Sequence, residues 1–412
     1  MADSTHVDQR RFALDVVRRL RSAGFEAYWA GGCVRDEVMG RQPKDYDVAT
    51  SALPQQVRDL FGRKRTLAIG AAFGVITVKG PRPAGMIEVA TFRQDAAYSD
   101  GRHPDHVTFS SAREDALRRD FTINGMFFDP IAEQVIDYVG GQEDIRRRRI
   151  RAIGEPRERI AEDKLRMLRA VRFAAALGFD LDADTAAAIR EMAGQIRAVS
   201  AERIAAEMRR MLVDSGRVRA VGRLLDVDLA RMVLPEIVRA DATASQRLEE
   251  ALAVLERLRQ PDFPLALAAL LGGTADAEAV RQIGLRWRLA NHETDRAAWL
   301  VEHRVALAGA KSLPWSRLQP LLVADGIEDL LAWHEAASPS GPEEAAHCRG
   351  LLRQPREVLN PPPLVTGDDL VAHGMIPGPI FKTILEEVRA AQLDGRVESK
   401  AEGLELADRI RS

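Results

Sequence analysis

The sequence has only two cysteines in 412 residues, Cys33 and Cys348, and they lie far apart. A disulfide framework is therefore not expected, whereas a reducing, cytoplasmic compartment is. The first residues, MADSTHVDQRRF, lack the apolar core of a secretory signal. The longest apolar run, residues 263–271, is too short to cross a bilayer. We expect no membrane partner.

An excess of either charge is also missing. There are 59 Lys and Arg against 61 Asp and Glu, which gives a formal net charge of −2. The total therefore does not reveal a nucleic-acid partner, although it can hide a basic face opposite an acidic one. Hydrophobic residues make up 46% and charged residues 29% of the chain, which is typical of a globular protein and excludes extended disorder.

The sequence changes character near Arg146. Before that point, β-like runs alternate with helical stretches and with Gly and Pro; the runs are residues 27–30, 75–78, 86–91 and 106–109. After it, helical periodicity follows in residues 160–178, 185–196 and 201–212, and three prolines at 361–363 precede a last helical segment. The sequence therefore predicts an α+β fold in which a mixed head is followed by helices.

A β-like run that leads into two glycines is the first candidate binding site. Gly31 and Gly32 precede Arg35 by a few residues. Glycine lets the backbone turn tightly beside a ligand, and the N–H groups of a following helix favour an anion. Arg35 would then contact phosphates. A glycine pair is also typical of a plain turn.

Two carboxylates follow shortly, in Asp45-Tyr46-Asp47-Val48. In a β-like run, Asp45 and Asp47 project from one face, while the residues between and after them face the other way. Hard oxygen ligands held in this way suit Mg²⁺. An isolated Asp-X-Asp is often only a solvated edge. Its position just after the glycine turn favours a phosphate site that faces a metal site.

Glu88 is the candidate third carboxylate. Two-metal phosphoryl transfer usually uses such a group. In the run at residues 86–91, Glu88 lies on the face opposite Ile87 and Val89. A surface charge is the alternative interpretation.

A second cluster combines two guanidiniums, a carboxylate and an amide in the segment Arg118-Arg119-Asp120-Phe121-Thr122-Ile123-Asn124. Such groups, placed beside apolar anchors, can hold the phosphates and ribose of a nucleotide. The alternative is a helix end with a salt bridge.

A third cluster lies in the predicted helix at residues 160–178. Helical spacing places Asp163, Arg166 and Arg169 on one face and Ala161 and Leu165 on the opposite, inward face. A carboxylate accepts from the exocyclic amine of C or A, and a guanidinium donates to ring acceptors on the same edge. An Asp/Arg pair can therefore select C and A against U and G. The alternative is that Asp163 and Arg166 simply pair with each other.

A weaker pattern is Arg203 with Glu207, spaced i, i+4 in Ala201-Glu202-Arg203-Ile204-Ala205-Ala206-Glu207. By itself this spacing is typical of a salt bridge within a helix.

In combination, these segments resemble the bacterial class II tRNA nucleotidyltransferase and poly(A) polymerase family. The matching segments are GGCVRD, DYDVAT, RRDFTING, DYVGG with the following DI, EDKLRMLRAVRFAA and AERIAAEM. They cover about half of the chain, residues 10–215, and residues 363–407 resemble the tail of longer bacterial members. The resemblance implies a polymerase-beta-like palm in a head, followed by neck, body and tail, which we place at 1–145, 146–200, 201–360 and 361–412.

The resemblance also implies roles for individual residues. Asp45 and Asp47 match the metal-binding pair, and Gly31, Gly32 and Arg35 match the segment beside the triphosphate. Arg119, Asp120 and Asn124 fall on the motif for ribose and phosphate recognition. Asp163 and Arg166, with Glu162 beside them, match the protein template that reads the incoming base. Arg169, on the same helix face, is a further candidate nucleotide-binding residue. Arg203 and Glu207 match the last motif, which supports the neck.

Three further segments bear on the activity within the family. Residues 270–273 read Leu-Leu-Gly-Gly, so the His-Asp doublet of a phosphohydrolase domain is absent. Residues 92–104 resemble the loop that CCA-adding members possess and CC-only members lack. Residues 69–75 do not resemble the Gly-Arg-Arg-Phe signature of one group of poly(A) polymerases.

The resemblance therefore implies template-independent addition of C and A to the 3′ end of tRNA, with CTP, ATP and Mg²⁺. Poly(A) synthesis or A-only addition is the alternative within the family. A catalytically silent RNA-binding protein is the alternative of another class.

Overall fold

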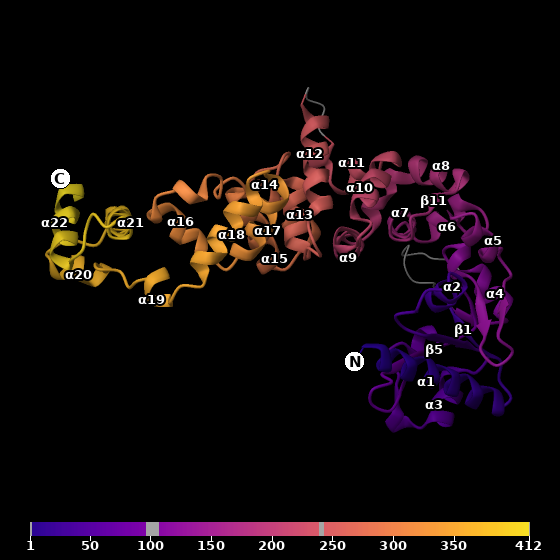
Figure 1. Ribbon diagram of the computed structural model, residues 1–412. Coiled ribbons are helices and arrows are strands. Elements are labelled where there is room, and N and C mark those ends of the chain that lie inside the picture. The colour runs from indigo at the N-terminus through magenta and orange to yellow at the C-terminus, as the bar shows by residue number, and fades with distance from the viewer. Residues whose placement is uncertain (1, 96–106, 239–242, 412) are drawn as a thin grey trace. The chain divides into compact units, whose positions relative to one another are not determined.

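The computed structural model describes residues 2–95, 107–238 and 243–411 (Figure 1). The chain divides into two compact units, Met1–Pro235 and Glu236–Ser412. Within the described ranges, no helix combines the length and the apolar character that crossing a membrane requires.

The first unit is built on a mixed sheet, in which seven strands are described, in the order β3-β4-β5-β2-β1-β8-β9. Only the β2–β5 pair is parallel; the other neighbours are antiparallel. The bounds are β1 Ala27–Ala30, β2 Asp47–Thr50, β3 Thr66–Leu67, β4 Val75–Lys79, β5 Met86–Thr91, β8 Phe127–Asp129 and β9 Gln134–Ile136. Two small pairs join β6 Arg93–Asp95 to β7 Val107–Phe109 and β10 Arg149–Ile150 to β11 Asp180–Leu181. The strand runs predicted at residues 27–30, 75–78 and 86–91 are confirmed. Of the run predicted at 106–109, residues 107–109 form β7, and residue 106 lies outside the described residues.

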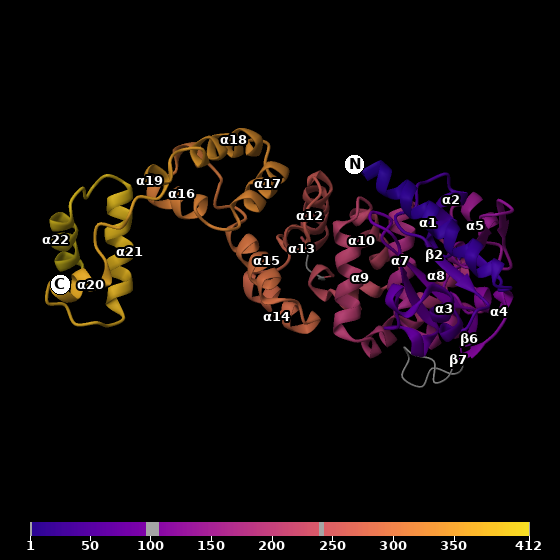
Figure 2. The same cartoon turned by 90° about the horizontal axis from the view of Figure 1, so that it is seen from below.

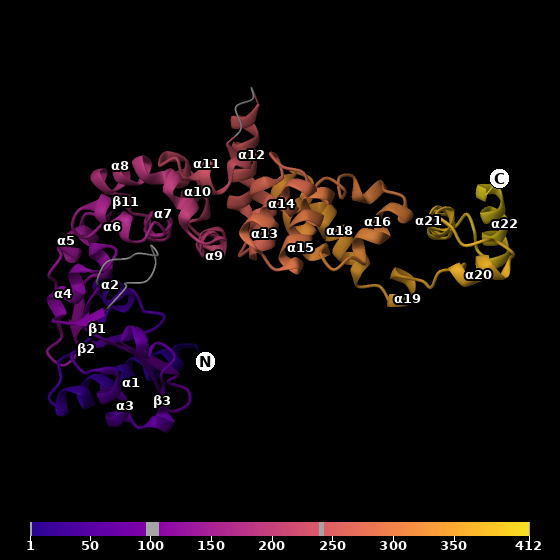
Figure 3. The same cartoon turned by 180° about the vertical axis from the view of Figure 1, so that it is seen from behind.

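Helices cover both faces of this sheet. Helices α1 (Ala2–Ser22) and α3 (Pro54–Phe61) lie on one side, as Figures 1 and 3 show. Their apolar side chains share one core with the inward residues Val48, Ile87 and Val89 of the strands. The other face carries α4 (Ala112–Leu117), which packs on Ala49 and Phe127. Because strand side chains alternate, Asp47 and Glu88 project from the face away from α1.

Two more helices accompany the strands, α2 (Gly32–Val38) between β1 and β2 and α5 (Gly141–Arg146) after β9. The part of the first unit that follows α5 is mainly helical. It contains α6 Pro156–Glu162, α7 Arg166–Leu177, α8 Ala183–Met192, α9 Ala201–Val213, α10 Arg217–Asp226 and α11 Leu229–Val233. Short 3-10 turns are η1 Arg63–Arg65, η2 Ala71–Phe73, η3 Thr122–Asn124, η4 Ala193–Ala198 and η5 Pro235–Ile237.

The single helix predicted at residues 160–178 is wrong, because the chain is interrupted between α6 and α7. Asp163 has extended backbone angles, φ −145° and ψ 104°, and its Oδ1 accepts the N–H of Leu165 at 3.0 Å. A short polar side chain that bonds to nearby backbone competes with helix formation in this way. Ala161, predicted to face inward, is exposed, whereas Leu165 is buried as predicted.

The second unit is helical throughout its described residues, and the predicted α+β fold class is confirmed. Its core is α13, in which every residue is buried. The helices are α12 Ala244–Arg257, α13 Phe263–Leu271, α14 Ala277–Trp287, α15 Asn291–His303, α16 Trp315–Leu322, α17 Ile327–Ala337, α18 Gly341–Leu352, α19 Arg356–Leu359, α20 Gly367–Ala372, α21 Ile380–Leu393 and α22 Lys400–Arg411, with η6 at Ala310–Ser312. Helices α20, α21 and α22 pack around their own small core (Figure 2).

Candidate active site

The glycine turn leads from β1 into α2. Gly31 has φ +75°, a value that glycine tolerates and other residues rarely adopt, and a Cβ there would meet the Arg119 guanidinium at 3.4 Å. From α2, Arg35 donates through Nη1 to Oδ1 of Asn124 at 2.9 Å and pairs with Asp36 at 2.8 Å. Arg35 and Asn124, 89 residues apart, therefore meet beside Gly32.

The two aspartates lie where β2 begins. Asp47 is the first residue of β2, and Asp45 lies just before it rather than within the strand. The predicted alternation holds, because Tyr46 and Val48 are buried while both aspartates are exposed. The parallel pairing of β2 with β5 makes Asp47 and Glu88 partners in register. A sheet contact thus brings the predicted third carboxylate beside the pair.

The carboxylates repel one another in the absence of a cation. Partial burial, together with the Asp45 and Glu88 carboxylates, raises the pKa of Asp47 to about 6, against a smaller opposing effect of Arg119. A divalent cation relieves such repulsion, and oxygen donors of this kind fit Mg²⁺. In the described residues, no group of three or more His, Cys, Asp or Glu has the arrangement of a preformed metal site. Metal binding by these carboxylates stays a prediction.

A cavity of about 670 Å³ lies between the sheet end and the first helices after it. Its lining holds seven arginines against three aspartates, so it favours a polyanion. The lining residues are Gly31, Gly32, Arg35, Asp45, Arg93, Arg118, Arg119, Asp120, Asn124, Asp163, Arg166, Arg169, Arg172 and Phe173. All the predicted nucleotide-binding residues are among them. Asp47 and Glu88 are not, although Asp45 is.

A buried carboxylate organises the arginines at the end of α4. Asp115, whose side chain is 1% exposed, pairs with Arg118 at 2.7 Å and with Arg119 at 2.9 Å. Burial opposes its ionisation, but the Arg119 and Arg118 guanidiniums outweigh burial and lower the pKa of Asp115. Asp120 in turn pairs with Arg169 of α7 at 2.6 Å. The predicted helix end with a salt bridge is therefore present, and the same residues also line the cavity.

The side chains of the predicted base-reading residues, Asp163 and Arg166, form their ionic contacts with other residues and not with each other. Asp163 does not pair with Arg166; both its oxygens accept from Arg203 of α9, at 3.1 and 2.7 Å. Arg166 pairs instead with Glu162 and donates to the Arg159 carbonyl. This arrangement leaves Asp163 and Arg166 side by side in the cavity lining without neutralising each other.

The simple i, i+4 salt bridge considered for Arg203 and Glu207 is wrong. Glu207 is buried and accepts from Arg172 of α7 at 2.6 Å and from Arg210 at 3.1 Å. Because Arg203 reaches Asp163, helix α9 makes two separate ionic contacts with the segment that lines the cavity. These contacts fix that segment without closing the cavity.

Several lining residues were not identified from the sequence. Phe173 has three guanidiniums over its ring, those of Arg172 at 4.1 Å, Arg169 at 5.4 Å and Arg35 at 5.7 Å. Its i, i+4 spacing from Arg169 could have placed Phe173 beside that arginine on one helix face, because such residues are neighbours in a helix. Arg93, which donates to the Phe73 carbonyl, lies within the segment 92–104 that was matched to a family loop. Residues 96–104 of that segment lie outside the described residues.

Replacement of Asp115 by asparagine should destabilise the first unit by about 3 kcal/mol at pH 7, because it leaves two guanidiniums without their buried counter-charge. A carboxyl with a lowered pKa stabilises the fold above its ordinary pKa of about 4. That contribution is lost as the pH falls through the lowered value. In urea unfolding, the difference between the variant and wild type should therefore be larger at pH 7 than at pH 3.

Asp59, an exposed residue of α3, offers a matched control for this experiment. Its replacement by asparagine should leave the urea midpoint nearly unchanged at both pH values. An Asp115→Asn midpoint equal to that of wild type at pH 7 would contradict the role of Asp115.

Two family models and many known proteins match this chain. Residues 27–151 match the poly A polymerase head domain, and residues 178–240 match the probable RNA and SrmB-binding site of polymerase A. The chain is 35% identical to the CCA-adding enzyme of Geobacillus kaustophilus over 95% of this chain and 94% of that protein. It is 32% identical to the CCA-adding enzyme of Lactiplantibacillus plantarum over the same shares.

Solved structures agree with these matches. The crystal structure of the Bacillus stearothermophilus CCA-adding enzyme in complex with CTP aligns with a TM-score of 0.73 at 30% identity, over 97% of both chains. The Thermotoga maritima CCA-adding enzyme complexed with tRNA aligns over 100% of this chain and 98% of that one, with a TM-score of 0.66. At 19% identity the second alignment shows a shared fold alone.

Proposed function

The chain belongs to the family of CCA-adding enzymes, and we propose that it adds C and A nucleotides to the 3′ end of tRNA without a nucleic-acid template. CTP and ATP are the nucleotide substrates. These nucleotidyltransferases are generally metal-dependent, and we propose Mg²⁺ as the metal of this one. We further propose a cytoplasmic location and the roles of head, neck, body and tail for residues 1–145, 146–200, 201–360 and 361–412.

One observation carries the proposal. Asp45, of the predicted metal pair, and the predicted base-reading residues Asp163 and Arg166 line the same arginine-rich cavity. Asp45 lies just before β2, and Asp163 and Arg166 lie where α6 ends and α7 begins, more than 100 residues later. Together, these two groups suit a site that handles both the phosphates and the base of a nucleotide.

The residues of this cavity, together with the neighbouring Asp47 and Glu88, divide the work of nucleotide transfer. Arg35 and Arg119 bind the triphosphate, and Asp120 and Asn124 position the ribose beside Gly31 and Gly32. Asp45 and Asp47 hold the metal, with Glu88 beside them as the third carboxylate. Bound there, Mg²⁺ supplies activation of the RNA 3′-hydroxyl and neutralises charge on the phosphates. Arg169 keeps Asp120 ionised and in place.

Selection of the base follows from the direction of hydrogen bonds. Asp163 accepts from the exocyclic amine of C or A, and Arg166 donates to a ring acceptor on the same edge. U and G present a carbonyl oxygen where C and A present the amine, so Asp163 would face an acceptor and lose its bond. Arg203 bonds to both oxygens of Asp163 and does not line the cavity, so its role is to orient the carboxylate rather than to touch the base.

Arg203→Ala should therefore reduce, but not abolish, selection of CTP over UTP. We expect the ratio of the two kcat/KM values to fall about tenfold, equivalent to about 1.4 kcal/mol, the lower part of the range for a bidentate contact. Arg203→Lys keeps one charged donor and should recover part of the selectivity. Equal ratios in wild type and Arg203→Ala would show that the ion pair supports the fold alone.

Sizing of products tests the function itself. Purified protein is incubated with tRNAs that end before, within and after CCA, with CTP and ATP offered separately and together. CCA addition predicts growth that stops at the completed end. Extension by A alone would indicate the A-adding alternative, and long products would indicate poly(A) synthesis. No extension of any tRNA would favour a silent RNA-binding protein.

A further inference from the structure

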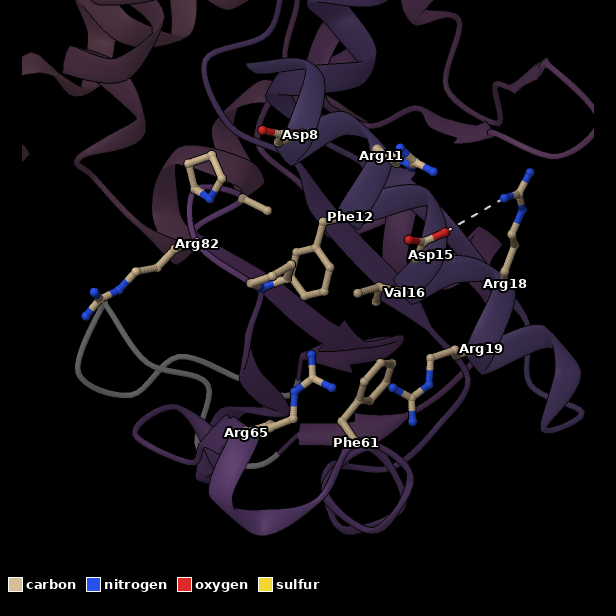
Figure 4. Close-up of a pocket in the computed structure, with 13 residues that line it drawn as sticks. Asp8, Arg11, Phe12, Asp15, Val16, Arg18, Arg19, Phe61, Arg65 and Arg82 are labelled. Carbon is tan, nitrogen blue, oxygen red and sulfur yellow. Dashed lines mark ion pairs between the residues drawn. The ribbon is translucent and has the colours of Figure 1, made fainter. Parts of the chain in front are cut away.

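A second cavity, of about 590 Å³, lies in the head and shares no lining residue with the first. Figure 4 shows its side chains, which come from α1, the end of α3, η1 and the β4–β5 connection. Its floor is apolar, because Phe12, Val16, Phe61 and Ala84 are buried there. Phe12 packs closely on the β4–β5 connection, since a Cβ at Gly80 would lie 2.7 Å from its ring. We call this cavity and its rim the α1–η1 groove.

The rim of the α1–η1 groove is basic. Its lining holds five arginines against two aspartates; the arginines are Arg11, Arg18, Arg19, Arg65 and Arg82. Arg63 and Lys64, exposed beside Arg65 in η1, extend the positive charge beyond the cavity.

Some of these guanidiniums already contact other groups of the protein, and others have no polar partner among the described residues. Arg19 donates to the Leu60 carbonyl at 3.0 Å and lies 4.7 Å from the centre of the Phe61 ring. Arg65 points between Phe12 and Phe61 (Figure 4). In the part of the chain that the structure describes, Arg11, Arg65 and Arg82 make no side-chain hydrogen bond or ion pair. Their charge is available to a ligand.

The groove lies at the same end of the sheet as the carboxylates, but on the opposite face. The β4–β5 connection joins Lys79 to Met86, and Glu88 lies two residues farther along β5, opposite Asp47. The carboxylates project away from the α1 face, whereas the groove lies on it. An RNA that reaches both sites must therefore pass around this end of the sheet, over the β4–β5 connection.

We propose that the α1–η1 groove binds the phosphate backbone of the RNA whose 3′ end occupies the carboxylate site. This inference depends on the proposed function, because it assigns a further contact to the same RNA. The exposed charges are spread around and beyond the cavity, which suits a chain of phosphates better than one compact anion. The apolar floor accommodates a ribose or a base face.

The triple variant Arg11→Ala, Arg65→Ala, Arg82→Ala tests the proposal. Binding of a fluorescently labelled tRNA that lacks CCA is measured without nucleotide, between 50 and 200 mM KCl. The salt slope, log Kd against log [KCl], should fall by about 1 for each lost phosphate contact, and Kd should rise at least about tenfold. Because these residues lie outside the first cavity, kcat at saturating tRNA should be unchanged.

A control variant removes the same charge elsewhere. Arg259, Arg317 and Arg353 are exposed, lie outside residues 178–240 and also make no side-chain hydrogen bond or ion pair within the described residues. Replacement of all three by alanine should leave the tRNA salt slope close to that of wild type.

The outcomes are distinct. An unchanged Kd and slope in the triple variant would overturn the proposal, as would an equal loss of affinity in the control. If pyrophosphate raises the melting temperature of wild type but not of the triple variant, while tRNA affinity is unchanged, the groove binds a small anion and the RNA assignment is wrong. If wild type binds tRNA but never extends it, the proposed function fails while the binding test still decides the groove.

Discussion

Alanine at both Asp45 and Asp47 should abolish incorporation of CTP and ATP into tRNA. These carboxylates are the oxygen donors of the predicted metal site, and the metal supplies several kcal/mol of transition-state stabilisation. At about 1.4 kcal/mol per factor of ten, we expect a loss of at least about 10³-fold in kcat. The measurement is single-turnover incorporation of labelled nucleotide into a tRNA that lacks CCA.

The fold should survive this change. Both side chains are exposed, and removal of two like charges relieves the repulsion that raises the pKa of Asp47. The matched control, Asp59→Ala in α3, should retain wild-type activity. Glu88→Gln should reduce activity less than the double change does, because Glu88 is only the third carboxylate. Incorporation by the double variant at the wild-type rate would refute the catalytic assignment.

The second large effect concerns the choice of base. Asp163→Asn replaces one acceptor oxygen by an amide donor, which can bond to the carbonyl that U and G present. Loss of a bidentate reading pair changes discrimination by about 1–3 kcal/mol, or roughly 5- to 150-fold. We expect the ratio of kcat/KM for CTP over UTP, and for ATP over GTP, to fall by that factor.

Two comparisons make this result specific. Asp184, exposed on α8 and absent from the lining of the first cavity, is the matched control, and Asp184→Asn should keep wild-type selectivity. Total incorporation by Asp163→Asn should persist, because the carboxylates of the metal site are untouched. An unchanged base preference together with normal activity would exclude Asp163 as the reader of the base.

Local patterns predicted most of the elements. Alternation of apolar and polar residues located β4 and β5, and the family resemblance was confirmed by the relatives. The pattern failed at Asp163, where a side-chain bond to the Leu165 N–H competes with the helix. Helical periodicity carries no information about such a local competitor, so the predicted continuous face was wrong.

The candidate site was predicted as a set of residues but not as a set of contacts. The sequence identified Asp163 and Arg166 by their chemistry. It did not reveal that Arg203, 40 residues later, holds Asp163, or that buried Asp115 holds Arg118 and Arg119. The alternative of a local i, i+3 pair followed from spacing alone, since the position of α9 was unknown.

The sequence by itself determined the class of chemistry, the family and the residues suited to a nucleotide, because motifs and alternation are local properties of the chain. The tertiary structure decided which of those residues meet. It paired Asp47 with Glu88 across parallel strands and placed Asp45 in one cavity with Asp163. The physical reason is that contacts between distant segments depend on how sheets and helices pack, and packing is set by the whole core rather than by any one motif.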